Sequence, residues 1–192
     1  VTCSHITFVG KGKDHTTVQG GFKVTNQQHV TFEELAITYP RATGCGLYLE
    51  GSETNVDVLK CVVKECAWRG MHVRGGAIVT ATQCEFMENG GTGVLCCDAN
   101  TKVRLNNCQV NHNEWRGLFA YERAVVDLHG TKTDIHSNKM IGILANYRAK
   151  VNIHLPSQHN TTHGNVGPDR FQVNGGSIAN INDDGTFTHV VE

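Results

Sequence analysis

The sequence predicts an all-β solenoid in which short strands stack in parallel, each on its own copy in the next coil. Three observations indicate this fold. Similar segments recur at steps of about 22 to 28 residues. Within each copy, apolar and polar residues alternate with a period of two. A glycine begins the last strand of most copies. We therefore expect a parallel β-helix of about 7–8 coils with three short strands per coil.

The first strand of each repeat carries the clearest pattern. Its second and fourth positions are apolar almost throughout, and its first and third positions are mostly polar. This alternation is typical of a strand with one buried face. The copies begin at His5, His29, Asn55, Ile78, Lys102, Val125, Lys150 and Ile178.

Two further strands follow in each repeat. The second strands are expected at 35–37, 61–63, 84–86, 108–110 and 133–135. The third strands are expected at 21–24, 46–49, 70–73, 93–96, 117–120 and 142–145. Most of the glycines that begin the third strands fit a tight turn that needs either a left-handed or an unhindered backbone. These are Gly46, Gly70, Gly93, Gly117 and Gly142.

Three segments, 6–22, 29–38 and 103–117, carry a resemblance to a known family. They resemble the right-handed parallel β-helix of the pectin-lyase-like superfamily, which includes polysaccharide-modifying enzymes and non-catalytic relatives. The resemblance covers nearly the whole chain and implies a right-handed coil. We expect a single β-helix domain over 1–192. Because the chain begins at Val1 without a methionine or a signal segment, we interpret it as an excised or processed fragment of a longer chain.

Composition excludes several other classes. The 192 residues are 39 % hydrophobic and 18 % charged, which is too apolar for a disordered chain. No apolar run reaches the ~18 residues that a membrane-spanning helix needs. The net charge of −1 creates no overall field for nucleic acid or anionic lipid. We therefore expect neither a membrane span nor a nucleic-acid partner.

Three of the eight cysteines fall on one inward position of three consecutive coils. Cys61, Cys84 and Cys108 are preceded there by Leu35 and followed by Thr133. This spacing predicts a ladder of buried free thiols, because two inward side chains side by side rarely reach the torsion of a disulfide. Reduced thiols favour an intracellular setting. An extracellular or virion setting would apply if the chain binds carbohydrate.

A second ladder lies three or four residues before the strand-opening glycines. It contains Cys66, Asn89, Asn113 and Asn138. Stacked asparagines can bond backbone groups at a turn, so we interpret this ladder as structural.

The outward face of the third strands contains the candidate binding residues. Its first outward position contains apolar residues in the middle of the chain, which predicts an exposed apolar strip. Such a strip favours contact with a protein partner or an oligomer mate. Alternatively, its aromatic rings, together with an arginine and a histidine, would stack on the sugar rings of a polysaccharide. The candidates are Tyr48, His72, Arg74, Leu95, Phe119, Tyr121 and Leu144. Trp68 and Trp115 recur at one turn two coils apart and are expected to pack over the edge of the core.

The outward face of the first strands contains the candidate catalytic group. It consists of Arg104, Asp127, His129 and His154, on neighbouring coils. A carboxylate and a histidine that titrates near neutrality could abstract a proton from a uronic acid. The alternative is a solvated polar face with one weak ion pair. The resemblance implies that catalytic relatives gather several carboxylates on adjacent coils. Here Asp57 and Asp127 are three coils apart.

Histidines are numerous but do not form a recognisable metal motif. His154, His159 and His163 follow one another in a long late loop, and His5 and His29 stack on adjacent coils. Zinc needs three or four converging ligands, so we predict no metal and no cofactor. Asn160 begins a glycosylation sequon that matters only in a secreted protein.

The preferred function is a non-catalytic recognition or scaffold module that binds a protein or a glycan along an outward strand face. A rigid repeat rod offers the extended surface that this needs. One alternative is a polysaccharide lyase, epimerase or glycoside hydrolase with its site on the first-strand face. Another is a structural segment of a virion or cell-surface spike.

Overall fold

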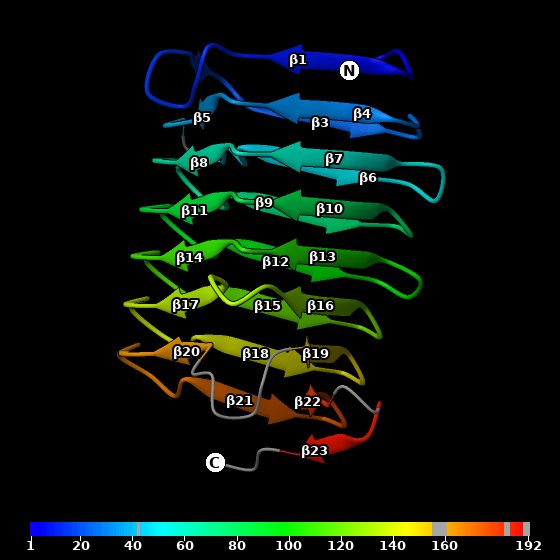
Figure 1. Ribbon diagram of the computed structural model, residues 1–192, viewed down its shortest axis with the longest axis vertical. Helices are drawn as coiled ribbons and strands as arrows, with labels where there is room; N and C mark the ends of the chain where they lie inside the picture. The colour runs from blue at the N-terminus through cyan, green and yellow to red at the C-terminus, as the bar shows by residue number, and fades with distance from the viewer. Residues whose placement is uncertain (42, 155–160, 183–184, 190–192) are drawn as a thin grey trace.

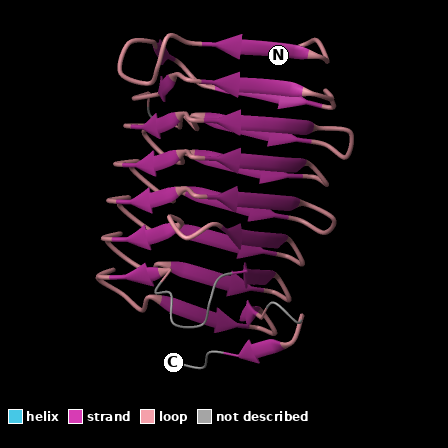
Figure 2. Ribbon diagram, viewed as in Figure 1, coloured by secondary structure: helices cyan, strands magenta, loops and turns pink. Residues whose placement is uncertain are grey.

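The protein is a rod of stacked coils, with the strands Ile6–Val9 and Phe187–His189 at opposite ends (Figure 1). A computed structural model describes residues 1–41, 43–154, 161–182 and 185–189. These residues form strands and turns and no helix (Figure 2). The described part of the chain therefore contains no long apolar helix of the kind that crosses a membrane. The predicted fold class is confirmed, because three sheets follow one another around about seven coils.

The three sheets each take one strand from every coil. The first sheet contains β1 (Ile6–Val9), β4 (Val30–Glu33), β7 (Asn55–Leu59), β10 (Ile78–Thr82), β13 (Lys102–Asn106), β16 (Val125–His129), β19 (Lys150–His154), β22 (Ser177–Ile181) and β23 (Phe187–His189). The second contains β2 (Thr17–Gln19), β5 (Ala36–Thr38), β8 (Val62–Lys64), β11 (Glu85–Met87), β14 (Gln109–Asn111), β17 (Asp134–His136) and β20 (Thr162–His163). The third contains β3 (Phe22–Thr25), β6 (Leu47–Glu50), β9 (Met71–Arg74), β12 (Val94–Cys97), β15 (Leu118–Tyr121), β18 (Ile143–Asn146) and β21 (Arg170–Val173).

The strands stack in parallel and in register, so each position forms a column along the rod. Val79 of β10, for example, lies opposite Val56 of β7 and Val103 of β13. All three are buried in the continuous core. An in-register stack keeps the period-two pattern on one face in every coil. β23 differs from the expectation, because it pairs with β22 in the antiparallel direction.

The second and third strands of a coil begin one residue later than the sequence predicts. β8 begins at Val62 rather than at Cys61, and β12 begins at Val94 rather than at Gly93. The ladder cysteines and the glycines therefore occupy the corners between strands.

The predicted cysteine ladder is confirmed. Cys61, Cys84 and Cys108 are buried, and all eight cysteines of the chain are free thiols. The Sγ of Cys84 donates to the carbonyl of Val58 at 3.2 Å, and the Sγ of Cys108 donates to the carbonyl of Ala81 at 3.3 Å. Burial raises the pKa of the Cys61 and Cys84 thiols, which keeps them protonated.

The predicted asparagine ladder is also confirmed, and it is one coil longer than expected. Each side-chain oxygen accepts from the backbone N–H of the residue one coil earlier, as Oδ1 of Asn113 does from Asn89 at 3.1 Å. Each amide nitrogen also donates to the next member, as Nδ2 of Asn113 does to Asn138 at 2.9 Å. Asn165 continues the ladder, because its Oδ1 accepts from Nδ2 of Asn138 at 2.9 Å. These bonds satisfy buried polar groups at the turn.

The glycines just before the third strands are required by close packing. A Cβ at Gly93 would lie 2.6 Å from the Nδ2 of Asn113. None of the five glycines that precede the third strands has a positive φ, so of the two predicted reasons for glycine, the left-handed backbone is wrong and the unhindered backbone remains. Non-glycine residues occupy left-handed corners instead. Lys60, Gln83 and Asn107, each just before a ladder cysteine, have φ values of 50°, 54° and 52°.

Candidate functional site

The outward column of the third sheet lies where the sequence places it. His72, Leu95, Phe119 and Leu144 are Cα partners from strand to strand. In the next outward column, Cys97 is the Cα partner of Tyr121, and Arg74 is the partner of Glu50. The seven predicted binding residues therefore share one face of the rod.

The prediction that this strip is exposed is wrong. Only 6 % of Leu95, 4 % of Leu144 and 7 % of His72 are accessible to solvent. Arginines from the preceding turn lie against two of the rings in the column, those of His72 and Phe119. Nη1 of Arg69 is 3.2 Å from Nδ1 of His72, and the guanidinium of Arg116 is 4.9 Å from the ring centre of Phe119. Long arginine stems can cover apolar surface while keeping their charge near water.

The prediction that Trp68 and Trp115 pack over the core edge is also wrong. Their exposed fractions are 37 % and 47 %. The asparagine ladder already closes the core at this turn, so the indole rings remain outside it. The guanidinium of Arg69 lies 3.8 Å from the ring centre of Trp68 and covers part of it.

A cavity of about 340 Å³ opens on the third-sheet face. It is lined by Arg69, His72, Arg74, Leu95, Cys97, Asp98, Phe119, Tyr121 and Glu122. Five of the seven predicted binding residues belong to this lining. The other two are close by in the fold: the ring of Tyr48 packs edge-on against His72 at 5.1 Å, and Leu144 follows Phe119 in the column.

The cavity floor has a fixed arrangement of charges. Nε of Arg74 lies 3.2 Å from Oδ2 of Asp98 and 3.7 Å from Oε1 of Glu50. The same Asp98 oxygen accepts from the backbone N–H of Gly75 at 3.0 Å. Arg74 is therefore held between two carboxylates, which orients its guanidinium on this face.

His72 is uncharged at neutral pH. Burial, together with the nearby Arg69 and Arg74, lowers the pKa of His72 to about 4. A guanidinium only donates hydrogen bonds, so Nδ1 of His72 accepts from Arg69. The proton of the neutral ring is then on Nε2, which lies 3.4 Å from the Sγ of Cys97. Burial raises the pKa of Cys97 to about 11, so the pair is a neutral imidazole and a thiol.

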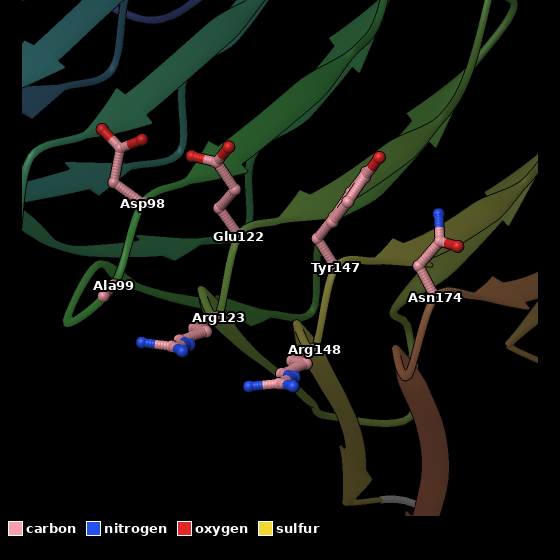
Figure 3. Close-up of a pocket in the computed structure, with 7 residues that line it drawn as sticks. All are labelled: Asp98, Ala99, Glu122, Arg123, Tyr147, Arg148 and Asn174. Atoms are coloured by element: carbon pink, nitrogen blue, oxygen red, sulfur yellow. The ribbon is translucent and has the colours of Figure 1, made fainter.

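A larger cavity of about 600 Å³ lies at the turns that follow the third-sheet strands (Figure 3). It is lined by Asp98, Ala99, Glu122, Arg123, Tyr147, Arg148 and Asn174. Asp98 and Glu122 line both cavities, so the two form one groove across the face and its edge. Sequence reasoning missed this second half, because it considered strand positions and not the turn residues beyond them.

Aromatic rings form one wall of the groove. The ring centres of Phe119 and Tyr121 are 5.5 Å apart, and those of Tyr121 and Tyr147 are 5.2 Å apart. The first contact is tilted and the second is edge-on, so the three rings form one continuous aromatic cluster beside the groove. Tyr147 lies two residues beyond the predicted third strand 142–145, where the sequence pattern gave no reason to single it out.

The candidate catalytic residues share a second face. Arg104 and Asp127 are Cα partners on β13 and β16, and His129 and His154 are partners on β16 and β19. Oδ1 of Asp127 lies 3.2 Å from Nε2 of His154 and accepts from Nδ2 of Asn152 at 2.8 Å. Asp127 thus pairs with His154 rather than with Arg104. The imidazoles of His129 and His154 stack at 4.2 Å.

The histidines of the late loop lie on different sheets. His154 ends β19, and His163 ends β20. His159 and Asn160 lie outside the described residues. His5 and His29 stack as predicted, with ring centres 4.9 Å apart. Within the described part of the chain, no three histidine, cysteine, aspartate or glutamate side chains are placed to hold a metal ion.

Comparison with known families agrees with this architecture. The model of the family described as "Right handed beta helix region" matches residues 4–166. The chain therefore belongs to that family, and the coil is right-handed. A search of curated proteins and a search of solved structures each found no match.

Proposed function

We propose that this protein is a non-catalytic recognition module that binds a saccharide chain in the groove of the third sheet. The observation that carries the proposal is the pair of joined cavities, which combine aromatic rings with arginines and carboxylates. Small-ligand sites are commonly concave, with a few placed polar groups that fix the orientation of the ligand. The groove has this composition.

The chemistry of a sugar suits these residues. Arginine and carboxylate side chains bind hydroxyl groups in opposite senses, since guanidinium donates and carboxylate accepts. The faces of Tyr121 and Tyr147 suit the apolar C–H face of a sugar ring. Arg74 is already oriented by Asp98, so its loss of freedom on binding is small.

A protein partner is less well supported on this face. Little of Leu95 or Leu144 in the apolar column reaches solvent, and arginines lie against the rings of His72 and Phe119 in the same column. The cores of protein interfaces are usually apolar and depleted in charge. The charged groove is closer in character to a polar small-ligand site.

An enzymatic function on the first-sheet face is the second candidate, on the observation that Asp127 and His154 lie 3.2 Å apart. A carboxylate that orients an imidazole is the arrangement of a general base. However, one oxygen of Asp127 also accepts from Asn152, and the two cavities described above do not include these residues.

A glycan-array screen followed by calorimetry tests the proposal. We expect one class of glycan to bind, and Tyr121→Ala to weaken that binding roughly threefold to tenfold through the loss of a stacking face. Gln109→Ala, an exposed position on the second sheet, is the matched control and should bind normally. Absence of any glycan binding, or equal binding by both variants, would overturn the proposal.

The same preparation tests the enzymatic candidate. The protein is incubated with uronate polymers, and products are measured by chromatography. Turnover that disappears in Asp127→Asn would replace recognition by catalysis as the function. We expect no turnover in either protein.

A further inference from the structure

Two pairs of stacked histidine rings join the same two coils. His129 of β16 and His154 of β19 stack with ring centres 4.2 Å apart and planes 7° apart. His136 of β17 and His163 of β20 stack at 5.3 Å and 5°. β16 and β17 belong to the sixth coil, and β19 and β20 belong to the seventh. One coil junction therefore contains both stacks, on two different sheets.

Each stack has one aspartate from the sixth coil. Oδ1 of Asp127 lies 3.2 Å from Nε2 of His154, and Oδ2 of Asp134 lies 3.1 Å from Nε2 of His163. A carboxylate at this distance stabilises one imidazolium in each stack. A second imidazolium in the same stack would have no further carboxylate at this distance.

His129 is the ring of the first stack that resists protonation. Burial lowers the pKa of His129, and His154 and Arg104 lower it further, while Asp127 acts in the opposite direction. The buried Nε2 of His129 has no hydrogen-bond partner. A proton on this nitrogen would therefore not be compensated locally.

In the second stack, His136 is the ring that resists protonation. Burial lowers the pKa of His136, and His163 and His112 contribute in the same direction. Asp134 and, more weakly, Glu85 oppose this shift. The ring of His112 meets His136 edge-on at 5.8 Å, so a third histidine adds to the positive charge that protonation would gather here.

We propose that the junction between the sixth and seventh coils is an acid-sensitive contact that opens when the second ring of each stack takes up a proton. Two cations would then face one carboxylate at stacking distance, on two sheets at once. Repulsion across the junction would loosen the seventh coil while leaving the earlier coils paired.

The sign of the effect follows from proton linkage. An accessible histidine titrates near pH 6.5, whereas His129 and His136 titrate lower in the closed junction. The open state therefore binds more protons below pH 6.5, and acid favours opening. Each histidine can contribute up to about a tenfold change in the opening constant per pH unit, so two can contribute up to about a hundredfold.

Acid opening would also change the groove, a consequence that rests on the proposed function. Asn174 follows β21 of the seventh coil and lines the larger cavity. Its Nδ2 donates to Oδ1 of Asn146 on the coil above at 2.9 Å. A loosened seventh coil would displace this wall, so a ligand held at neutral pH would be released in acid.

Hydrogen exchange with mass spectrometry tests the junction without any ligand. The whole chain is exchanged at pH 7.5 and at pH 5.0, and rates are corrected for intrinsic chemistry. We expect the opening constant of peptides from β19 and β21 to rise at least about tenfold at pH 5.0, while peptides from β7 and β9 change little. Equal behaviour of the two regions would overturn the proposal.

Asparagine is chosen to replace each of the two histidines, because the protein itself has asparagine at the equivalent positions of the preceding coil. Asn106 and Asn111 occupy the columns of His129 and His136 one coil earlier, so asparagine fits both positions. The double variant His129→Asn/His136→Asn should lose the acid response. His15→Asn, exposed in the first coil, should keep it. A double variant that opens in acid like the unaltered protein would show that other groups are responsible.

A measurement on the unaltered protein covers the case in which the variants do not fold. Histidine ring protons are followed by NMR from pH 8 to pH 4. His129 and His136 should titrate below the ordinary histidine value of about 6.5, and the amide signals of β19 should change with them. Titration of both rings at or above about pH 6.5 would overturn the proposal. Loss of glycan binding in all conditions would instead count against the proposed function and leave the exchange result standing.

Discussion

Replacement of Asn113 by alanine removes the central member of the asparagine ladder. Asn113 is fully buried at the turn before β15. Its Oδ1 accepts from the backbone N–H of Asn89 at 3.1 Å and from Nδ2 of Asn89 at 2.9 Å. Its Nδ2 donates to the carbonyl of Phe86 at 3.0 Å and to Oδ1 of Asn138 at 2.9 Å. The variant therefore breaks four bonds to three other residues.

The expected cost comes from the groups that lose a partner. The N–H of Asn89 loses its acceptor, and the carbonyl of Phe86 loses its side-chain donor. The amide of Asn89 keeps its bond to the carbonyl of Val63, and Oδ1 of Asn138 keeps the N–H of residue 113. Each buried polar group left without a partner costs about 1–3 kcal/mol. The carbonyl of Phe86 stays within the β11–β14 ladder, so the N–H of Asn89 is the group left without a partner, and we expect Asn113→Ala to lower the free energy of unfolding by about 1–3 kcal/mol.

Urea unfolding followed by circular dichroism at pH 7.5 measures this loss. Gln109→Ala, exposed on β14, is the control and should change the free energy of unfolding by less than about 0.5 kcal/mol. A loss below about 1 kcal/mol for Asn113→Ala would refute the reasoning. It would mean that water or a shifted turn satisfies the exposed groups, and that the ladder does not hold the coils together.

Three other predictions concern the interior. Cys84→Ser should destabilise the protein by about 1–3 kcal/mol in the same assay, while exposed Cys3→Ser should be neutral; a neutral Cys84→Ser would contradict its inward placement. Gly93→Ala places a Cβ 2.6 Å from both Val110 Cγ1 and Asn113 Nδ2, and should cost about 1–3 kcal/mol. An unchanged unfolding midpoint would argue against this close packing. Iodoacetamide at pH 8 should alkylate Cys3 and spare Cys84, whose burial raises its pKa, and mass spectrometry of the native protein would reveal any early reaction at Cys84.

Much of the fold could be predicted because a solenoid repeats one local pattern. The period-two alternation assigned the buried column of Val56, Val79 and Val103, and all three lie in the core. The spacing of Asn89, Asn113 and Asn138 assigned the ladder. In a parallel stack, a side chain contacts the equivalent side chain of the next coil. Two residues that are one repeat apart in the sequence can therefore be predicted to lie in contact.

The corners were not predictable in the same way. Lys60 and Gln83 adopt positive φ, although neither residue type has a local preference for it. Their conformation is imposed by the strands on either side, which must meet at a fixed angle in every coil. The second and third strands begin one residue later than predicted for a related reason. The corner residue continues the apolar–polar alternation, but it is not part of the strand.

Part of the candidate site was assigned and part was not. The outward positions of His72, Phe119 and Tyr121 followed from alternation, and these residues line the groove. The turn residues Tyr147 and Arg148 were missed, because nothing in a turn sequence says which way its side chains extend.

Sequence alone determined which face of each strand points inward, how the coils stack and which residues share a column, because each of these depends on a period that can be counted. Only the tertiary structure decided which outward residues are free. Leu95 points outward as counted, yet it is buried. Its column neighbours His72 and Phe119 each have an arginine from the preceding turn against their ring. The exposure of a side chain depends on the path of its neighbours through space, and no repeat in the sequence records that path.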